Sequence, residues 1–63
     1  MNFGEKLRNA RKKAGLTQQQ VADALELERS SIARYELGQV EPKLKIIPKF
    51  CEILNVSAEY LLY

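Results

Sequence analysis

The apolar residues of this chain recur three and four positions apart from one end to the other. No segment alternates apolar and polar residues for long enough to form a strand. The spacing therefore predicts an all-α fold with five short helices and tight connections, at about residues 2–14, 18–25, 29–37, 44–54 and 58–63. Because 63 residues leave room for one small domain, we expect residues 1–63 to form it.

Local signals mark where these helices begin and end. Asn2 with Glu5 and Thr17 with Gln20 have the spacing of capping boxes, which start the first two helices. Pro48 must lie near the start of the fourth helix, because a proline deeper inside costs about 3 kcal/mol. The remaining helix ends are marked by residues that favour a left-handed backbone or cap a helix: Gly15, Gly38, Asn55 and Ser57.

Composition and charge exclude several classes of protein. The chain has no histidine and one cysteine, Cys51, which excludes a disulfide framework, leaves too few ligands for a structural zinc ion and predicts no cofactor. No apolar run approaches the length of a membrane span, and the five cations of the first thirteen residues are not followed by the apolar stretch of a signal peptide, so we expect a cytoplasmic chain without a membrane partner. Residues 1–20 carry five cations and one anion, a net +4, which permits contact with a nucleic acid.

Residues 17–37 have the pattern of two short helices that cross closely. Ala22 is small enough for the two helices to approach each other, and Ile32 fills the space between them. This is the requirement of a helix-turn-helix, whose second helix is held rigidly against the first and enters a major groove.

The chain resembles the phage-repressor and Cro-type helix-turn-helix domains and the bacterial Xre-like regulators. The resemblance lies in Leu7-Arg8, Gly15-Leu16-Thr17-Gln18, Val21-Ala22, Leu25, Ser31 to Gly38, Pro42 and Ile53 to Ser57. It implies a compact five-helix repressor-like domain of bacterial or phage origin. It also implies a sequence-specific transcriptional regulator, expected to be a repressor, that reads double-stranded DNA with helix 29–37 and binds a palindromic operator as a homodimer.

The third predicted helix has an outward arc suited to reading bases. At about 100° per residue, Arg29, Ser30, Ala33, Arg34 and Leu37 span roughly 140° and include no acid. Arginine can bind guanine, serine can donate or accept, and alanine can contact a thymine methyl group. An ordinary solvated helix face is the alternative interpretation. The predicted DNA contacts are Thr17, Gln18, Arg29, Ser30, Ser31, Ala33, Arg34, Lys12, Lys13 and Lys43.

The members of this set outside the arc have different expected roles. Thr17 caps its helix, and the neighbouring N–H groups can point at a phosphate. The resemblance implies that Gln18 contacts a phosphate or base and braces the recognition helix. Lys12, Lys13 and Lys43 are candidate phosphate contacts, although cations at a helix end also complement its dipole.

The resemblance further implies a buried salt bridge between Arg11 and Glu36 that positions the third helix. Three residues depart from the family pattern. Glu26 stands where glycine is common, at a cost of about 1–2 kcal/mol if its backbone is left-handed. Glu28 and Lys43 stand where capping residues are common, and Glu28 also brings a negative charge towards the DNA.

Two further interpretations concern partners. The tail of the chain has more apolar surface than one short helix can bury, which predicts a dimer contact through Ala58, Leu61 and Tyr63. The alternative to DNA binding is a protein-interaction module, antitoxin-like or anti-regulator, that uses the same fold. No small-molecule ligand is predicted. The chain also lacks a nucleophile with a visible base, so we predict no enzyme.

Overall fold

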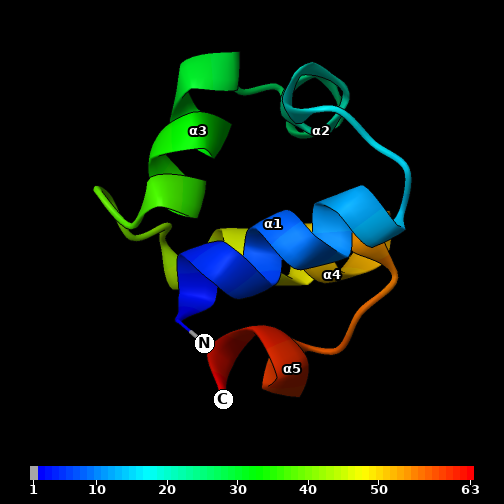
Figure 1. Ribbon diagram of the computed structural model, residues 1–63, viewed down its shortest axis with the longest axis vertical. Coiled ribbons are helices and arrows are strands. Elements are labelled where there is room, and N and C mark those ends of the chain that lie inside the picture. Colours follow the sequence, from blue (N-terminus) through cyan, green and yellow to red (C-terminus); the bar gives the residue numbers. More distant parts are fainter. Residues whose placement is uncertain (1) are drawn as a thin grey trace.

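A computed structural model describes residues 2–63, and the regular structure of these residues is entirely helical, with no strand (Figure 1). The elements are α1 (Phe3–Lys13), α2 (Gln18–Leu25), α3 (Arg29–Leu37), the 3-10 turn η1 (Leu44–Ile46), α4 (Ile47–Leu54) and α5 (Ala58–Leu62). The all-α prediction is confirmed, and the predicted bounds of α2 and α3 are those observed.

The fourth predicted helix needs a correction. Residues 44–54 do not form one α-helix, because η1 precedes α4. Pro48 explains the change: it has no N–H to donate to the carbonyl of Leu44, and its ring would clash with that carbonyl in a continuous α-helix. Pro48 lies in the first turn of α4, as predicted.

Side-chain caps start three of the helices. Asn2 Oδ1 accepts from the N–H of Glu5 at 2.9 Å. Thr17 and Gln20 form the second capping box, with Thr17 Oγ1 accepting from the Gln20 N–H at 3.0 Å. Ser57 Oγ accepts from the Tyr60 N–H at 3.0 Å. Each cap satisfies an N–H group that the helix itself leaves unpaired.

The turn between α2 and α3 is sharp because it contains a left-handed residue. Glu26 has φ 59° and ψ 41°, the conformation that glycine favours. This left-handed residue reverses the direction of the chain, so that the N–H of Leu27 donates to the carbonyl of Ala22 at 2.8 Å. Glu28 then precedes α3 in extended conformation, and its side chain makes no capping hydrogen bond.

One hydrophobic core joins the five helices. Its fully enclosed members include Ala22 and Ile32, both 0% exposed, at the crossing of α2 and α3. Leu61 is 1% exposed, so it belongs to this core and is not available for the dimer contact predicted for it. The buried apolar residues are Leu7, Ala10, Val21, Ala22, Leu25, Ile32, Ile47, Phe50, Leu54 and Leu61.

The arrangement exposes α2 and α3 together on one side of the molecule. Figure 1 shows α1 and α4 across the middle, with α2 and α3 on one side of them and α5 on the other. Gly4 allows α1 to approach α3 closely, because a Cβ there would lie 2.7 Å from the Tyr35 carbonyl oxygen and nearer still to that of Glu36. Within residues 2–63, no helix has the length and apolar character needed to cross a membrane.

Candidate nucleic-acid interface

Helix α3 turns one side towards solvent and the other into the core. Ile32 is buried and so is Glu36, whereas Arg29, Ser30, Arg34 and Leu37 are exposed. Ala33 is half-buried at the edge of the exposed face. Ser31 is also half-buried and lies away from the predicted arc, so the structure separates it from the other proposed contacts.

A buried ion pair fastens α3 to α1. Arg11 Nε donates to Glu36 Oε2 at 2.6 Å, and Arg11 Nη2 donates to Glu36 Oε1 at 3.1 Å. The two side chains are only 11% and 3% exposed. Arg11 Nη1 also donates to the carbonyl of Leu16 at 2.9 Å. One guanidinium therefore joins α1, the turn before α2, and the last turn of α3, which fixes the orientation of the whole helix-turn-helix.

Gln18 extends this network to the surface. Its Nε2 donates to Glu36 Oε1 at 3.1 Å, and its Oε1 accepts from Arg29 Nη1 at 3.3 Å. Gln18 is the first residue of α2, and Arg29 is the first residue of α3. The start of each helix of the motif is thereby tied to the other through side chains.

The surface around Gln18 joins three helices into one shallow, continuous face. One hollow there is lined by Thr17, Gln18 and Arg29. A second hollow includes Gln18 again, together with Ala33 and Leu37 of α3 and both Glu5 and Arg8 of α1. Arg8 is an exposed cation that sequence reasoning did not include among the contacts. The sequence could have indicated Arg8 as a contact, because it lies about one turn before Arg11 on the same helix.

The beginning of α2 adds donors to this face. Thr17 satisfies the third N–H of the helix, but the first two N–H groups have no partner within a helix. Together with the positive end of the helix dipole, such groups bind anions such as phosphate.

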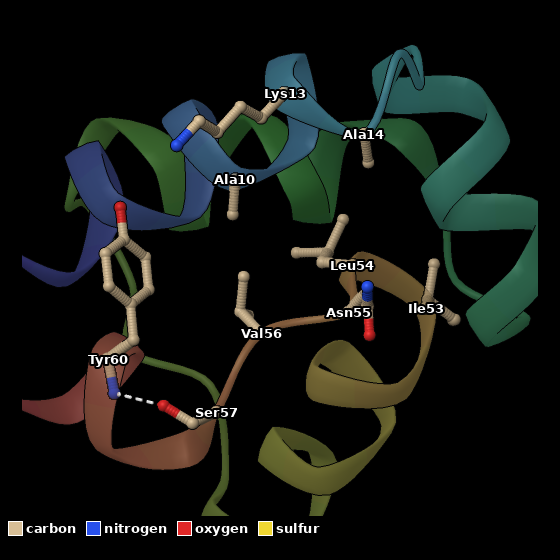
Figure 2. Close-up of a pocket in the computed structure, with 9 residues that line it drawn as sticks. All are labelled: Ala10, Lys13, Ala14, Ile53, Leu54, Asn55, Val56, Ser57 and Tyr60. Atoms are coloured by element: carbon tan, nitrogen blue, oxygen red, sulfur yellow. Dashed lines mark hydrogen bonds between the residues drawn. The ribbon is translucent and has the colours of Figure 1, made fainter.

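The three lysines predicted as phosphate contacts do not share one location. Lys12 lies about 40° around α1 from Arg8, on the side of the shallow face. Lys13 instead lines a different hollow, of about 660 Å³, between α1 and the segment that joins α4 to α5. Figure 2 shows Lys13 there beside Tyr60, above Ala10 and Val56. Lys43 is exposed and precedes η1.

Comparisons with known proteins agree with this geometry. Residues 7–61 match the family model described as Helix-turn-helix. The chain is 43% identical over 60 residues to the SPbeta prophage-derived uncharacterized HTH-type transcriptional regulator YonR of Bacillus subtilis, covering 95% of this chain and 56% of that protein. The chain spans about half the length of the curated relatives it matches.

Two solved structures share both fold and sequence with the chain. The restriction-modification controller protein C.AhdI of Aeromonas hydrophila aligns with a TM-score of 0.86 and 33% identity, covering 95% of this chain and 91% of that one. The P22 c2 repressor, solved in complex with a synthetic operator, aligns with a TM-score of 0.90 and 26% identity, covering 98% and 94%.

Proposed function

Because the chain belongs to the phage-repressor and Cro-type helix-turn-helix family, we propose that it is the sequence-specific DNA-binding domain of a transcriptional regulator. It reads the major groove of an operator with the exposed side of α3. The observation that carries this proposal is the exposed arc of α3, which presents Arg29, Ser30 and Arg34 and no acid of its own, while the other side of α3 is fixed by a buried ion pair. The operator complex of the similar P22 c2 repressor supports it.

Base contacts and phosphate contacts come from different parts of the face. Arg29, Ser30, Ala33 and Arg34 approach the base edges, where they can distinguish the four base pairs. The phosphate contacts come from the start of α2 at Thr17 and from the flanking cations, namely Arg8, Lys12 and Lys43. Lys13 is the weakest of the proposed contacts, because it lines a hollow that includes no residue of α3.

We further propose that two copies bind one operator. A single small module buries roughly 600–1,000 Å² of protein on DNA, which favours a second copy for tight binding. Exposed apolar side chains are available for a second copy to cover. Leu44 is 77% exposed and Tyr63 is 90% exposed. Leu44 and Leu62 line one hollow with Phe3. Of the contacts predicted in the tail, Ala58 and Tyr63 stay in this proposal and Leu61 does not.

The dimer is tested by sedimentation in the presence of an operator duplex. Leu44→Glu should leave the fold intact, because the side chain is exposed, and should shift the complex from two copies per duplex to one. Ala24→Glu, an exposed substitution on α2, is the matched control and should leave two copies. A single wild-type copy at saturating protein would contradict the dimer.

The DNA-binding proposal is tested by selection from a pool of random-sequence duplexes. We expect an enriched palindrome whose half-site preferences change in Ser30→Ala and Arg34→Ala. Lys49→Ala, an exposed substitution on α4, should retain the wild-type preferences. Weak binding without enrichment would contradict a sequence-specific reader.

A protein-interaction module is the second candidate. The exposed Glu28 beside α3 is the observation that favours it, because an acid near the reading face opposes phosphate binding. Salt distinguishes the two functions. Affinity for DNA falls steeply as salt rises, through release of counterions, whereas an apolar protein interface responds little. In either case we propose a cytoplasmic chain with no enzymatic role.

A further inference from the structure

We propose that Glu28 determines one base of the operator, because its carboxylate accepts a hydrogen bond from the N4 amino group of a cytosine. The inference rests on the proposed function and names a base that the site selects. Glu28 is exposed and directly precedes α3. Two features of the structure carry the inference: the fixed backbone around Glu28, and a carboxylate that has no partner within residues 2–63.

The backbone on both sides of Glu28 is fixed. Leu27 packs against the core, and its N–H donates to the carbonyl of Ala22 at 2.8 Å. On the other side, the carbonyl of Glu28 accepts from the N–H of Ser31 at 3.0 Å. The Glu28 side chain therefore leaves the molecule from a defined point at the N-terminal end of α3. This is the end of a recognition helix whose residues contact base edges.

The Glu28 carboxylate is available to an external donor. It makes no capping hydrogen bond to α3, and within residues 2–63 it forms no ion pair. The adjacent cation, Arg29, directs its Nη1 to Gln18 Oε1 at 3.3 Å. A serine, threonine or aspartate before α3 would satisfy a free N–H of the helix. Glu28 lacks that stabilising contact and leaves both carboxylate oxygens unpaired.

A carboxylate distinguishes the four bases by their donors. It accepts hydrogen bonds and cannot donate one. In the major groove, guanine presents the acceptors N7 and O6 and thymine presents the acceptor O4, so both repel it. Cytosine N4 and adenine N6 are donors, but adenine also places the acceptor N7 beside its amino group. We therefore expect cytosine to be the best base opposite Glu28, adenine the next, and guanine and thymine the worst.

The charge of Glu28 adds selectivity at the expense of affinity. An acid near the phosphates weakens binding to every duplex. A hydrogen bond from cytosine offsets this repulsion at the correct sequence alone, and discrimination against wrong partners commonly uses such a repulsive element. Removing the charge should therefore tighten binding to incorrect sequences more than to the operator.

The experiment uses the operator obtained by selection and replaces each base pair of one half-site with the other three. Relative affinities are measured by competition with a fluorescent duplex. At one C·G pair we expect the wild-type chain to prefer cytosine over thymine by roughly 5- to 150-fold. Glu28→Gln keeps the length of the side chain, removes the charge and can donate as well as accept. It should reduce that preference several-fold and leave the preferences at other positions.

A modified duplex tests the contact itself. In it, the cytosine at that position is replaced by a pyrimidine that lacks the N4 amino group. The wild-type chain should lose affinity for this duplex, whereas Glu28→Gln should bind it and the unmodified operator with a smaller difference. Such non-additivity between the two changes is the sign of a direct interaction.

Two further variants separate the contact from charge and from helix stability. Glu26→Gln removes the same charge two residues earlier and keeps a Cβ in the left-handed position. It is the matched control and should retain the cytosine preference. Glu28→Thr also removes the carboxylate but supplies a capping hydroxyl. It should lose the cytosine preference even though α3 is capped, and thermal unfolding of each variant establishes that it is folded.

Three results would overturn the inference. A folded Glu28→Gln variant that keeps every base preference would make Glu28 a solvated acid at a helix end, whether or not its affinity rises uniformly. A preference lost at an A·T pair would assign Glu28 to a different base. Equal losses in Glu26→Gln and Glu28→Gln would attribute the effect to charge alone. A wild-type chain that prefers no sequence would instead refute the proposed function itself.

Discussion

Replacing Glu26 with glycine should stabilise the domain. The backbone of Glu26 is left-handed, with φ 59°, and this conformation costs a residue with a Cβ about 1–2 kcal/mol. Glycine avoids that cost but loses more freedom on folding, about 0.5–1 kcal/mol. The difference predicts a gain of about 0.5–1 kcal/mol in the free energy of unfolding. Since 1 kcal/mol shifts the Tm of a domain of this size by about 4–8 °C, we expect a rise of about 2–8 °C.

Far-ultraviolet circular dichroism during heating measures this change, and a second variant isolates its cause. Glu26 follows α2, so its removal also takes a negative charge from the negative end of a helix dipole. Glu26→Ala removes the same charge but keeps a Cβ in the left-handed position. Glu26→Gly should therefore exceed Glu26→Ala in Tm. A glycine variant that melts no higher than the wild type, or no higher than the alanine variant, would refute the argument from backbone strain.

Three further substitutions test the fold and the interface. Gly4→Ala should lower the free energy of unfolding by about 1–3 kcal/mol, because its Cβ would overlap the backbone of α3; denaturant unfolding checks this, and wild-type stability would contradict it. Glu36→Gln should cost about 3–5 kcal/mol by leaving Arg11 buried without a counter-charge, so a variant that unfolds like the wild type would argue against the ion pair. Lys43→Ala should reduce the slope of log affinity against log salt by about one for each copy bound, and an unchanged slope in fluorescence anisotropy would exclude Lys43 from the phosphate contacts.

Local signals in the sequence predicted most of the fold because capping and turn geometry involve only neighbouring residues. Thr17 and Gln20 define the start of α2 without help from the rest of the chain. The boundary at η1 was wrong because apolar spacing over three residues does not distinguish a 3-10 turn from an α-helix. Pro48 could have predicted this boundary, because a proline cannot accommodate the α-helical position of the carbonyl four residues before it.

Features that depend on several helices at once were less accessible. The burial of Leu61 depends on how α5 packs against the rest of the molecule, and an apolar tail has the same sequence pattern whether it faces the core or a partner. The close approach at Gly4 leaves no local pattern at all. Likewise, the spacing of Gln18 and Arg29 in the chain gives no sign that their side chains meet.

The most direct test of the account is to map the DNA-bound face by nuclear magnetic resonance, following each backbone amide as the selected operator duplex is added. We predict the largest shifts at the start of α2 and along the exposed side of α3, from Gln18 and from Arg29 to Arg34. We predict small shifts around the hollow between α1 and the α4–α5 segment, at Ile53 and Val56. Shifts concentrated at that hollow, with α3 unaffected, would contradict the proposal that this helix reads the DNA.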